Sequence, residues 1–461
     1  MGGDVTISLF KEKTRLLRPI EADSQRRFSS VFQQPVGSVD GIFREMEKHK
    51  FIGGKMKSSY PRLLMLAGFA VFLVAALAKT SEAIPLFARK YHVSCFRCHT
   101  VPPVLNDFGR RFQINGYQLP GTDESEPIWA QEPLSLSFVF YPSFVSAHTV
   151  TTVGNTKTTD DKLAFEPSGL DLFTAGTIGR HLSYFLAAPI GINGPGQFSP
   201  SIETMSIMFN NLLGPDGQSN LNFRFGRFRL FNTFPNNTSL IESADYLIYD
   251  YEPVTPLQGS LLLAEPQWAA SVYGFFPQLL DGLRYEAAIS NGMAGDISLK
   301  NNEATFLMLE QTEYVDNSPF RLGVFYYGGK QLLADTTSNN LSRVGLAAEI
   351  NDPWTKRFDL SLEYMSALDD NVGGAKQTMT GGFAGLNVLI VPEKFFIYGR
   401  YDFTNVKETL ERQNQYTGGI RYHFAPNVGA YLELSYLTDK TPSVSTETKT
   451  TLSTLGVMVG F

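Results

Sequence analysis

The residues best placed to do chemistry are Cys95-Phe96-Arg97-Cys98-His99, which include both cysteines of the chain. A Cys-x-x-Cys-His sequence is the attachment signature of c-type haem. Each thiol can bond one vinyl group of the porphyrin, and the adjacent imidazole is then placed to bind the iron. We therefore predict one covalently attached haem c, with Cys95 and Cys98 as attachment sites and His99 as an axial iron ligand.

Other uses of paired cysteines fit the sequence less well. A dithiol redox motif needs no adjacent histidine and normally lies in a βαβ setting, of which the sequence shows no sign. A structural zinc site needs a fourth ligand and usually has a second pair of cysteine or histidine residues. A chance occurrence of five residues is the remaining alternative, so the rest of the chain has to be compatible with haem.

The segment from Met56 to Ala83 has the parts of a secretory signal peptide. Lys57 and Arg62 give a positive start, residues 63–78 are apolar or small, and Ala83 ends a small-x-small cleavage sequence. An uncleaved anchor helix is the alternative, although the apolar stretch is short for a membrane span. Export fits the motif, because bacteria attach c-type haem after the chain has crossed the inner membrane.

The signal peptide divides the chain into four parts. Residues 1–55 are polar and charged without a clear apolar period, and we interpret them as an extension produced by a start codon placed too early. Residues 56–83 are the predicted signal peptide, and residues 84–130 are the predicted monohaem cytochrome c segment. Residues 131–461 differ in composition, with frequent Gly, Phe and Tyr and short alternating runs.

Alternation of apolar and polar residues marks the strands of residues 131–461. Along 357–364 the apolar side chains share one face, namely Phe358, Leu360, Leu362 and Tyr364. The same alternation recurs along 395–403 and 428–436. Because successive side chains of a strand point to opposite faces, each strand has one apolar and one polar face. A β-sandwich with a wet outer face and a membrane barrel with a wet lumen would both show this pattern.

The connections favour the barrel. We predict about sixteen strands, beginning near residues 134, 163, 181, 203, 220, 260, 283, 304, 319, 343, 357, 379, 395, 416, 428 and 452. Short links alternate with long ones, the long ones being 147–162, 193–202, 232–259, 292–303, 328–342, 366–378, 404–415 and 438–451. Outer-membrane barrels have an even strand number, short periplasmic turns and longer external loops. The predicted fold is thus all-β, a transmembrane antiparallel β-barrel with a small N-terminal helical haem c plug.

The C-terminal strand and the composition agree with an outer-membrane location. Leu455, Val457 and Val459 alternate with polar or small residues up to the terminal Phe461, which resembles the signal read by the bacterial outer-membrane assembly machinery. The 13% aromatic content fits girdles at the two lipid interfaces. The net charge of −6 gives no indication of nucleic-acid binding. We expect outer-membrane lipid to surround the barrel.

Residues 85–117 resemble the fused outer-membrane monohaem c-type cytochrome–porins of iron-oxidising bacteria. The matching positions are Phe87, Ala88, Arg89, Cys95, Cys98, His99, Pro103, Leu105, Phe108, Gly109, Arg110, Phe112, Gly116 and Tyr117. The sequence departs from the family pattern at Lys90-Tyr91, where a Gln-Thr-type pair is expected, and at Gln113, where Lys is expected. The resemblance implies a haem plug in a porin-like barrel and Fe(II) as the electron donor, although similar segments occur in cytochromes with other donors.

The haem segment also makes physical sense by itself. Leu105, Phe108 and Phe112 have helical spacing and could cover one face of the haem. A segment this short rarely folds alone, so the barrel wall should complete its packing. Four basic residues could pair with the haem propionates or, alternatively, face water or lumen carboxylates; they are Arg89, Arg97, Arg110 and Arg111.

The second axial iron ligand is not evident from the sequence. Two histidines beside short turns and two methionines of lumen-facing parity are candidates, namely His181, His423, Met365 and Met458. Most Met and His residues only fill space. The choice matters because an axial methionine raises the haem potential.

The longest predicted loop carries a group of acidic residues. Its carboxylates could attract Fe(II) to the mouth of the barrel, and the candidates are Glu242, Asp245, Asp250 and Glu252. The loop could equally fold inward as a constriction, or its charges could simply be solvated.

These features predict an electron conduit in the bacterial outer membrane. We expect a haem that accepts electrons from an extracellular donor, with Fe(II) implied by the resemblance, and that delivers them to a periplasmic c-type cytochrome. Such a role needs no acid–base pair. The alternatives are outward electron flow to an extracellular acceptor, a passive porin whose plug contains haem, and a haem catalyst or ligand sensor.

Overall fold

The computed structural model describes residues 86–120, 122, 135–193, 197–214, 217–257, 260–277, 279, 282–292, 303–333 and 337–461. The expected extension (1–55) and signal peptide (56–83) lie outside these residues. Within the described ranges, no helix has the length and apolar character needed to cross a membrane.

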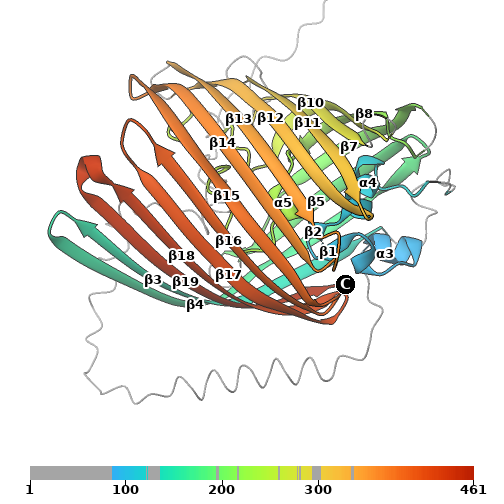
Figure 1. Ribbon diagram of the computed structural model, residues 1–461, viewed down its shortest axis with the longest axis horizontal. Helices are drawn as coiled ribbons and strands as arrows, with labels where there is room; N and C mark the ends of the chain where they lie inside the picture. Colours follow the sequence, from blue (N-terminus) through green and yellow to red (C-terminus); the bar gives the residue numbers. More distant parts are fainter. Residues whose placement is uncertain are drawn as a thin grey trace, which may run out of the picture. The chain divides into compact units, whose positions relative to one another are not determined.

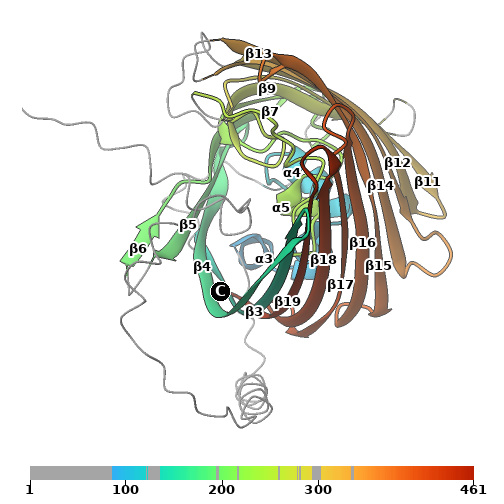
Figure 2. The same ribbon diagram turned by 90° about the vertical axis from the view of Figure 1, so that its left-hand side faces the viewer.

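Sixteen strands of the described chain close into an antiparallel barrel, which confirms the predicted fold class (Figures 1 and 2). Their bounds are β3 Ser137–Val153, β4 Thr156–Gly179, β5 Leu182–Asn193, β7 Thr204–Leu213, β8 Leu221–Phe228, β9 Gln267–Phe276, β10 Leu283–Ser290, β11 Glu303–Val315, β12 Ser318–Leu332, β13 Ser338–Asn351, β14 Phe358–Val372, β15 Ala375–Val391, β16 Phe395–Val406, β17 Arg412–Ala425, β18 Val428–Thr441 and β19 Thr446–Gly460. A further short strand, β6 (Gln197–Pro200), pairs with the end of β5 beyond the part of β5 that pairs with β7.

The last strand closes the barrel against the first. β19 pairs with β3 from Thr446 opposite Val153 down to Gly460 opposite Val139. Phe138 and the terminal Phe461 then exchange two backbone hydrogen bonds, with N···O distances of 2.7 and 2.9 Å. The C-terminal strand predicted from the alternation is therefore the one that completes the wall.

The two faces of each strand have the predicted character. On β14 the outward Leu362 and Tyr364 are 36% and 51% exposed, whereas the inward Glu363 and Met365 are 5% and 0% exposed. Outward apolar side chains of this kind recur around the barrel, for example Leu307 and Leu346. An apolar outer surface with charged residues inside is the arrangement of a barrel embedded in lipid.

Several predicted long links are wrong, because the strands continue through them. β3 and β4 are joined only by residues 154–155, and β14 and β15 only by residues 373–374. In the outer parts of these hairpins polar residues fall on both faces, so the regular apolar alternation is lost. Thr-rich sequence nevertheless favours an extended backbone. The Thr149 hydroxyl of β3 lies 3.2 Å from the Thr450 hydroxyl of β19, the strand that pairs with β3 on its other side.

One link is long and folds into the barrel. The lumen link (residues 229–266) joins β8 to β9 and contains helix α5 (Asn236–Ser239), so the strand expected near residue 260 begins at Gln267. Its apolar side chains form one buried cluster with inward-facing aromatic residues of the wall; members include Phe231, Phe234, Tyr246, Tyr249, Tyr273, Phe306, Phe325 and Phe383. This part of the lumen is thus packed like a protein core.

The N-terminal residues form a second body inside the ring of strands (Figure 2). This plug segment (residues 86–120) contains helix α3 (Leu86–Tyr91), the 3-10 turn η3 (Cys95–Arg97), a two-stranded sheet of β1 (His99–Val101) and β2 (Val104–Leu105), and helix α4 (Asp107–Ile114). Figure 1 shows α3 beside the C-terminal end of the chain.

Candidate functional site

The two predicted haem-attachment cysteines and the predicted iron ligand line one cavity. Cys95, Cys98 and His99 face a space of about 510 Å³ between the plug segment and the barrel wall. Helices α3 and α4 form one side, and the inward faces of β3, β4, β5 and β19 form the other. The lining is predominantly apolar, and the volume lies within the range of cofactor pockets.

A short turn places the two thiols and the imidazole together. The hydroxyl of Ser94 caps η3 by accepting from the backbone N–H of Phe96, and the Cys98 N–H donates to the Cys95 carbonyl at 3.2 Å. Asn106 then fastens the turn to α4, because its side chain accepts from Gly109 N–H at 2.9 Å and donates to the Arg97 carbonyl at 3.1 Å. The motif is therefore held by hydrogen bonds on both sides.

A backbone carbonyl fixes the orientation of the His99 ring. Its Nδ1 lies 3.0 Å from the Pro103 carbonyl oxygen. Because a carbonyl can only accept, Nδ1 carries the proton and the lone pair is on Nε2. Burial lowers the pKa of His99 below its ordinary value, so the imidazole is neutral at neutral pH. A neutral imidazole is the form that binds metal.

The two cysteines do not have the character of a redox dithiol. Burial raises the pKa of both Cys95 and Cys98 to about 11, so both thiols are protonated at neutral pH. A reactive dithiol has a lowered thiol pKa. The raised thiol pKa values of Cys95 and Cys98 therefore do not match those of an exchanging dithiol.

Helix α4 forms the predicted apolar cover. Leu105, Phe108 and Phe112 all line the cavity, and the Phe112 ring packs edge-on against Phe87 with centroids 5.0 Å apart. The helix comes so close to the motif that a Cβ atom on Gly109 would lie 2.1 Å from the Cys98 carbonyl oxygen. The donor set, the apolar walls and the volume together fit a haem c.

The barrel side of the cavity could not be predicted from the sequence. Its polar residues come from four separate places in the chain, namely Tyr141, Asp171, Glu203 and Asn427. Glu203 is paired with Arg229 of the lumen link at 2.7 Å. These residues meet only because the barrel closes around the plug segment, and no local sequence signal marks that closure.

The four candidate second ligands lie in different environments. Met458 lines the cavity together with the haem motif. His181 lies on an exposed turn, where its Nδ1 contacts the Asn210 carbonyl oxygen at 3.0 Å. Met365 is completely buried in the core of the lumen link. His423 is buried edge-on against Phe96, with ring centroids 5.5 Å apart.

The arginines of the plug segment are engaged mainly by the protein. Arg110 donates to Glu349 at 2.7 Å, so lumen carboxylates, rather than propionates, are its partners. Arg111 pairs with Asp107 at 3.1 Å, and Arg97 lies 4.2 Å over the Phe108 ring. Arg89 donates to the Leu136 carbonyl. Arg110 thus anchors the plug segment to the barrel.

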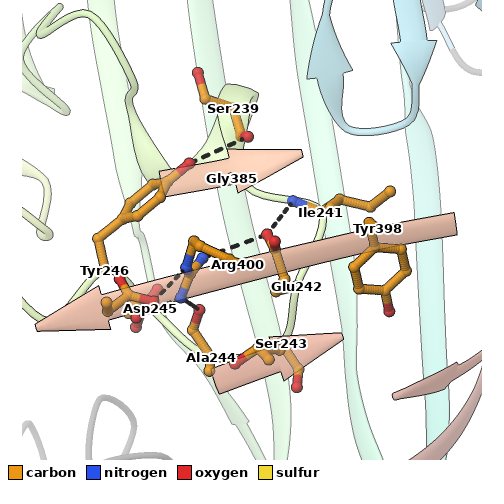
Figure 3. A network of polar contacts seen from close by, with 12 residues as sticks. Ser239, Ile241, Glu242, Ser243, Ala244, Asp245, Tyr246, Gly385, Tyr398 and Arg400 are labelled. Atoms are coloured by element: carbon orange, nitrogen blue, oxygen red, sulfur yellow. Dashed lines mark hydrogen bonds and ion pairs between the residues drawn. The ribbon is translucent and has the colours of Figure 1, made fainter. Parts of the chain in front are cut away.

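A buried polar network fastens the lumen link to the wall (Figure 3). Arg400 of β16 donates to the Glu242 carboxylate at 3.3 Å and to the Ala244 and Asp245 carbonyls at 2.6 and 2.9 Å. Next to it, the Ser243 N–H donates to the carboxylate of Glu433. One arginine therefore holds three nearby residues of the lumen link, Glu242, Ala244 and Asp245, against the wall.

The acidic residues predicted to attract Fe(II) lie in this inward-folded link. Glu242 is paired with Arg400, Asp245 accepts from Asn236 at 2.9 Å, and Glu252 accepts from Gln331 at 3.2 Å. Asp250 is half-buried in the same link. In the part of the chain that the structure describes, no group of three or more His, Cys, Asp or Glu side chains is arranged to hold a metal ion. The link adopts the inward-folded alternative.

Comparison with known proteins identifies the architecture. No protein-family model matches the chain, and no curated protein matches its sequence. An anion-selective porin from Comamonas acidovorans has a similar structure, with a TM-score of 0.51 and 12% identity over 71% of this chain and 99% of the porin. The outer membrane channel DcaP of Acinetobacter baumannii is similar at a TM-score of 0.48 and 11% identity, over 71% of this chain and 97% of DcaP. The chain has the barrel fold of porins.

Proposed function

We propose that this protein is an outer-membrane electron conduit with one covalently attached haem c. It takes electrons from an extracellular donor, Fe(II), and delivers them to a periplasmic c-type cytochrome. The observation that carries the proposal is the shared cavity of Cys95, Cys98 and His99 inside a closed barrel. The choice of Fe(II) rests on the resemblance of residues 85–117 to the cytochrome–porins of iron-oxidising bacteria.

The residues of the cavity can perform three tasks. Cys95 and Cys98 would fix the cofactor, and His99, whose ring Pro103 orients through Nδ1, would bind the iron through Nε2. The haem, when bound, supplies a one-electron redox centre. The apolar side chains of α4 keep water from one side of the cavity, and solvent exclusion and ligand identity are the means by which a protein sets a haem potential.

The cavity lies at the end of the barrel that faces the periplasm in this proposal. It is lined by Ser137 at the start of β3, by Gly460 at the end of β19 and by Asn427 in the β17–β18 turn. Short turns of outer-membrane barrels are periplasmic. A soluble periplasmic cytochrome could therefore approach the cofactor closely.

The lumen packing favours electron transfer over solute transport. Inward-facing Phe306 and Met308 of β11 are at most 2% exposed beneath the lumen link. An aqueous porin has a polar, water-filled interior. On the opposite side, the inward positions of β3 from Ala147 to Thr151 are only half-buried. We place the donor's approach along that side.

A visible spectrum of the purified, oxidised protein in detergent tests the proposal. The wild-type chain, produced with haem maturation, should show a c-type α band that grows on anaerobic addition of Fe(II). The matched control is the double variant Cys95→Ser/Cys98→Ser, which should fold as a barrel without covalent haem. A wild-type preparation without covalent haem would overturn the proposal, and reduction by dithionite but not by Fe(II) would remove Fe(II) as the donor.

The direction of electron flow is tested in proteoliposomes that enclose an oxidised c-type cytochrome. Fe(II) added outside should reduce the enclosed cytochrome in vesicles with the wild-type chain and not with the double cysteine variant. Oxidation of an enclosed, reduced cytochrome by an external acceptor, without the inward reaction, would instead establish outward flow.

A further inference from the structure

We propose that Met458 is the second axial ligand of the haem iron, an inference that rests on the proposed function. Apart from His99, Met458 is the only methionine or histidine among the described residues that line the cavity. The other polar lining groups are hydroxyls, carboxylates and amides, which bind a low-spin haem iron less well than a thioether. Methionine is an established partner of histidine in c-type cytochromes.

Strand β19 directs the Met458 side chain inward. Thr454, Gly456 and Gly460, which share its parity, are buried, whereas the alternate residue Leu455 is 37% exposed on the outer face. Met458 itself is only half-buried despite this inward position. Since it lines the cavity, we attribute its remaining exposure to the open cavity space.

Two glycines lie next to Met458 on the inward face of the wall. Across the sheet its direct partner is Gly429, and the next inward position on its own strand is Gly460. Neither neighbour has a side chain that would cover the thioether. The Met458 thioether is therefore left uncovered by these two neighbours, while Tyr141 of β3 lines the same cavity.

The other inward-facing methionines of the wall are engaged elsewhere. They are at most 2% exposed and do not line the cavity; they are Met208, Met308, Met365 and Met379. This contrast separates Met458 from residues whose role is core packing.

His423 is the strongest competitor, because it is 2% exposed and neither ring nitrogen has a hydrogen-bond partner. Its ring, however, contacts Phe96 and Phe396, and Phe96 packs with the apolar cluster of β1, β2 and β16. Neither Phe96 nor His423 lines the cavity. His423 is thus packed outside the cavity, whereas Met458 lines it together with Cys95, Cys98 and His99.

The test compares Met458→Leu with Met365→Leu in the haem-loaded, detergent-solubilised protein. Both substitutions replace an inward-facing wall methionine at nearly constant volume, which a barrel should tolerate. The wild-type chain and Met365→Leu should show the red charge-transfer band of a methionine-ligated ferric haem. Met458→Leu should lose that band and have a lower midpoint potential, and Met458→His should restore a six-coordinate, low-spin spectrum at low potential.

Two results would overturn the assignment. One is a charge-transfer band that survives Met458→Leu, and the other is a bis-histidine spectrum of the wild-type chain that becomes high-spin in His423→Leu. In either case covalent haem would still be present, so the proposed function would stand. Absence of covalent haem from the wild-type chain would instead reject the proposed function itself.

Discussion

The guanidinium of Arg110 donates to the carboxylate of Glu349 at 2.7 Å and joins helix α4 to strand β13 across 239 residues of sequence. Both side chains are at most 10% exposed, and Arg321 contacts the same carboxylate at 3.1 Å. A charged contact so far from water stabilises docking only while both partners are present. The plug segment is therefore held by a specific buried pair as well as by apolar contacts.

Replacing Arg110 with methionine should loosen the plug segment without opening the barrel. We expect the free energy that docks the plug segment in the barrel to weaken by about 2 kcal/mol. The effect is no larger because Arg321 still neutralises Glu349. Trypsin should cleave residues 86–120 faster than in the wild-type chain. The heat-modifiable electrophoretic migration that reports a folded barrel should stay unchanged. Lys162→Met, which removes the exposed pair with Glu166, is the control and should have no effect on cleavage. Equal protection in both variants would show that the pair does not hold the plug.

Gly109→Ala should displace α4 from the haem motif. The new methyl group would lie 2.1 Å from the Cys98 carbonyl oxygen, which requires one of the two backbones to move. Forced overpacking of this kind costs about 1–3 kcal/mol, so the haem-to-protein ratio or the midpoint potential should fall. In Gly399→Ala the nearest atom would be 3.7 Å away, and that variant should match the wild type. An unchanged haem content and potential in Gly109→Ala would refute the close packing of α4 on the motif.

Arg400→Ala should release the lumen link. The substitution removes the partner of Glu242 and Asp402, and breaking a buried pair from one side costs about 3–5 kcal/mol. In planar bilayers the wild-type chain should conduct ions poorly, and the variant should conduct more. Arg412→Ala, at an exposed position of β17, serves as the control. High conductance of the intact wild-type chain would favour the passive-porin alternative.

The lumen link should be better protected in acid than at neutral pH. Burial raises the pKa of Glu252 above its ordinary value. A carboxyl whose folded-state pKa is raised stabilises the fold fully below its unfolded pKa, and that contribution is lost as the pH rises through the folded pKa. Protease cleavage of the link should thus increase as the pH rises above the ordinary pKa of a glutamate carboxyl. The increase should be smaller in Glu252→Gln, and an identical pH profile in both proteins would remove Glu252 as the cause.

The fold was predictable from the sequence because strand alternation is a local property. The outward apolar positions of β14 and the closing strand β19 follow from a period of two along a few residues each. The ends of the hairpins were not predictable, because at Thr149 and Thr450 both faces are polar and the period disappears. The inward fold of residues 229–266 was left open, since the burial of Tyr246 and Tyr249 depends on wall residues such as Phe383 that are distant in sequence.

The residues of the site also differ in whether the sequence alone reveals them. Cys95, Cys98 and His99 are adjacent in sequence, so their chemistry is evident without a structure. Tyr141, Asp171 and Met458 come together only when the first and last strands pair. Parity alone placed Met365 and Met458 on the same face, and only the packing of the lumen link separates them.

The seam between β3 and β19 also imposes an order on biogenesis. The cavity wall contains residues from both ends of the barrel, Ser137 and Gly460, so the pocket does not exist until the last strand has been placed. In the closed barrel Cys95 and Cys98 are half-buried and face this cavity. On the proposed function, we expect haem attachment to precede barrel closure, because the completed wall of β3 and β19 encloses one side of the cavity that holds the two cysteines. A chain truncated before β19 should accumulate with haem attached and without a closed barrel, which would separate the two steps in time.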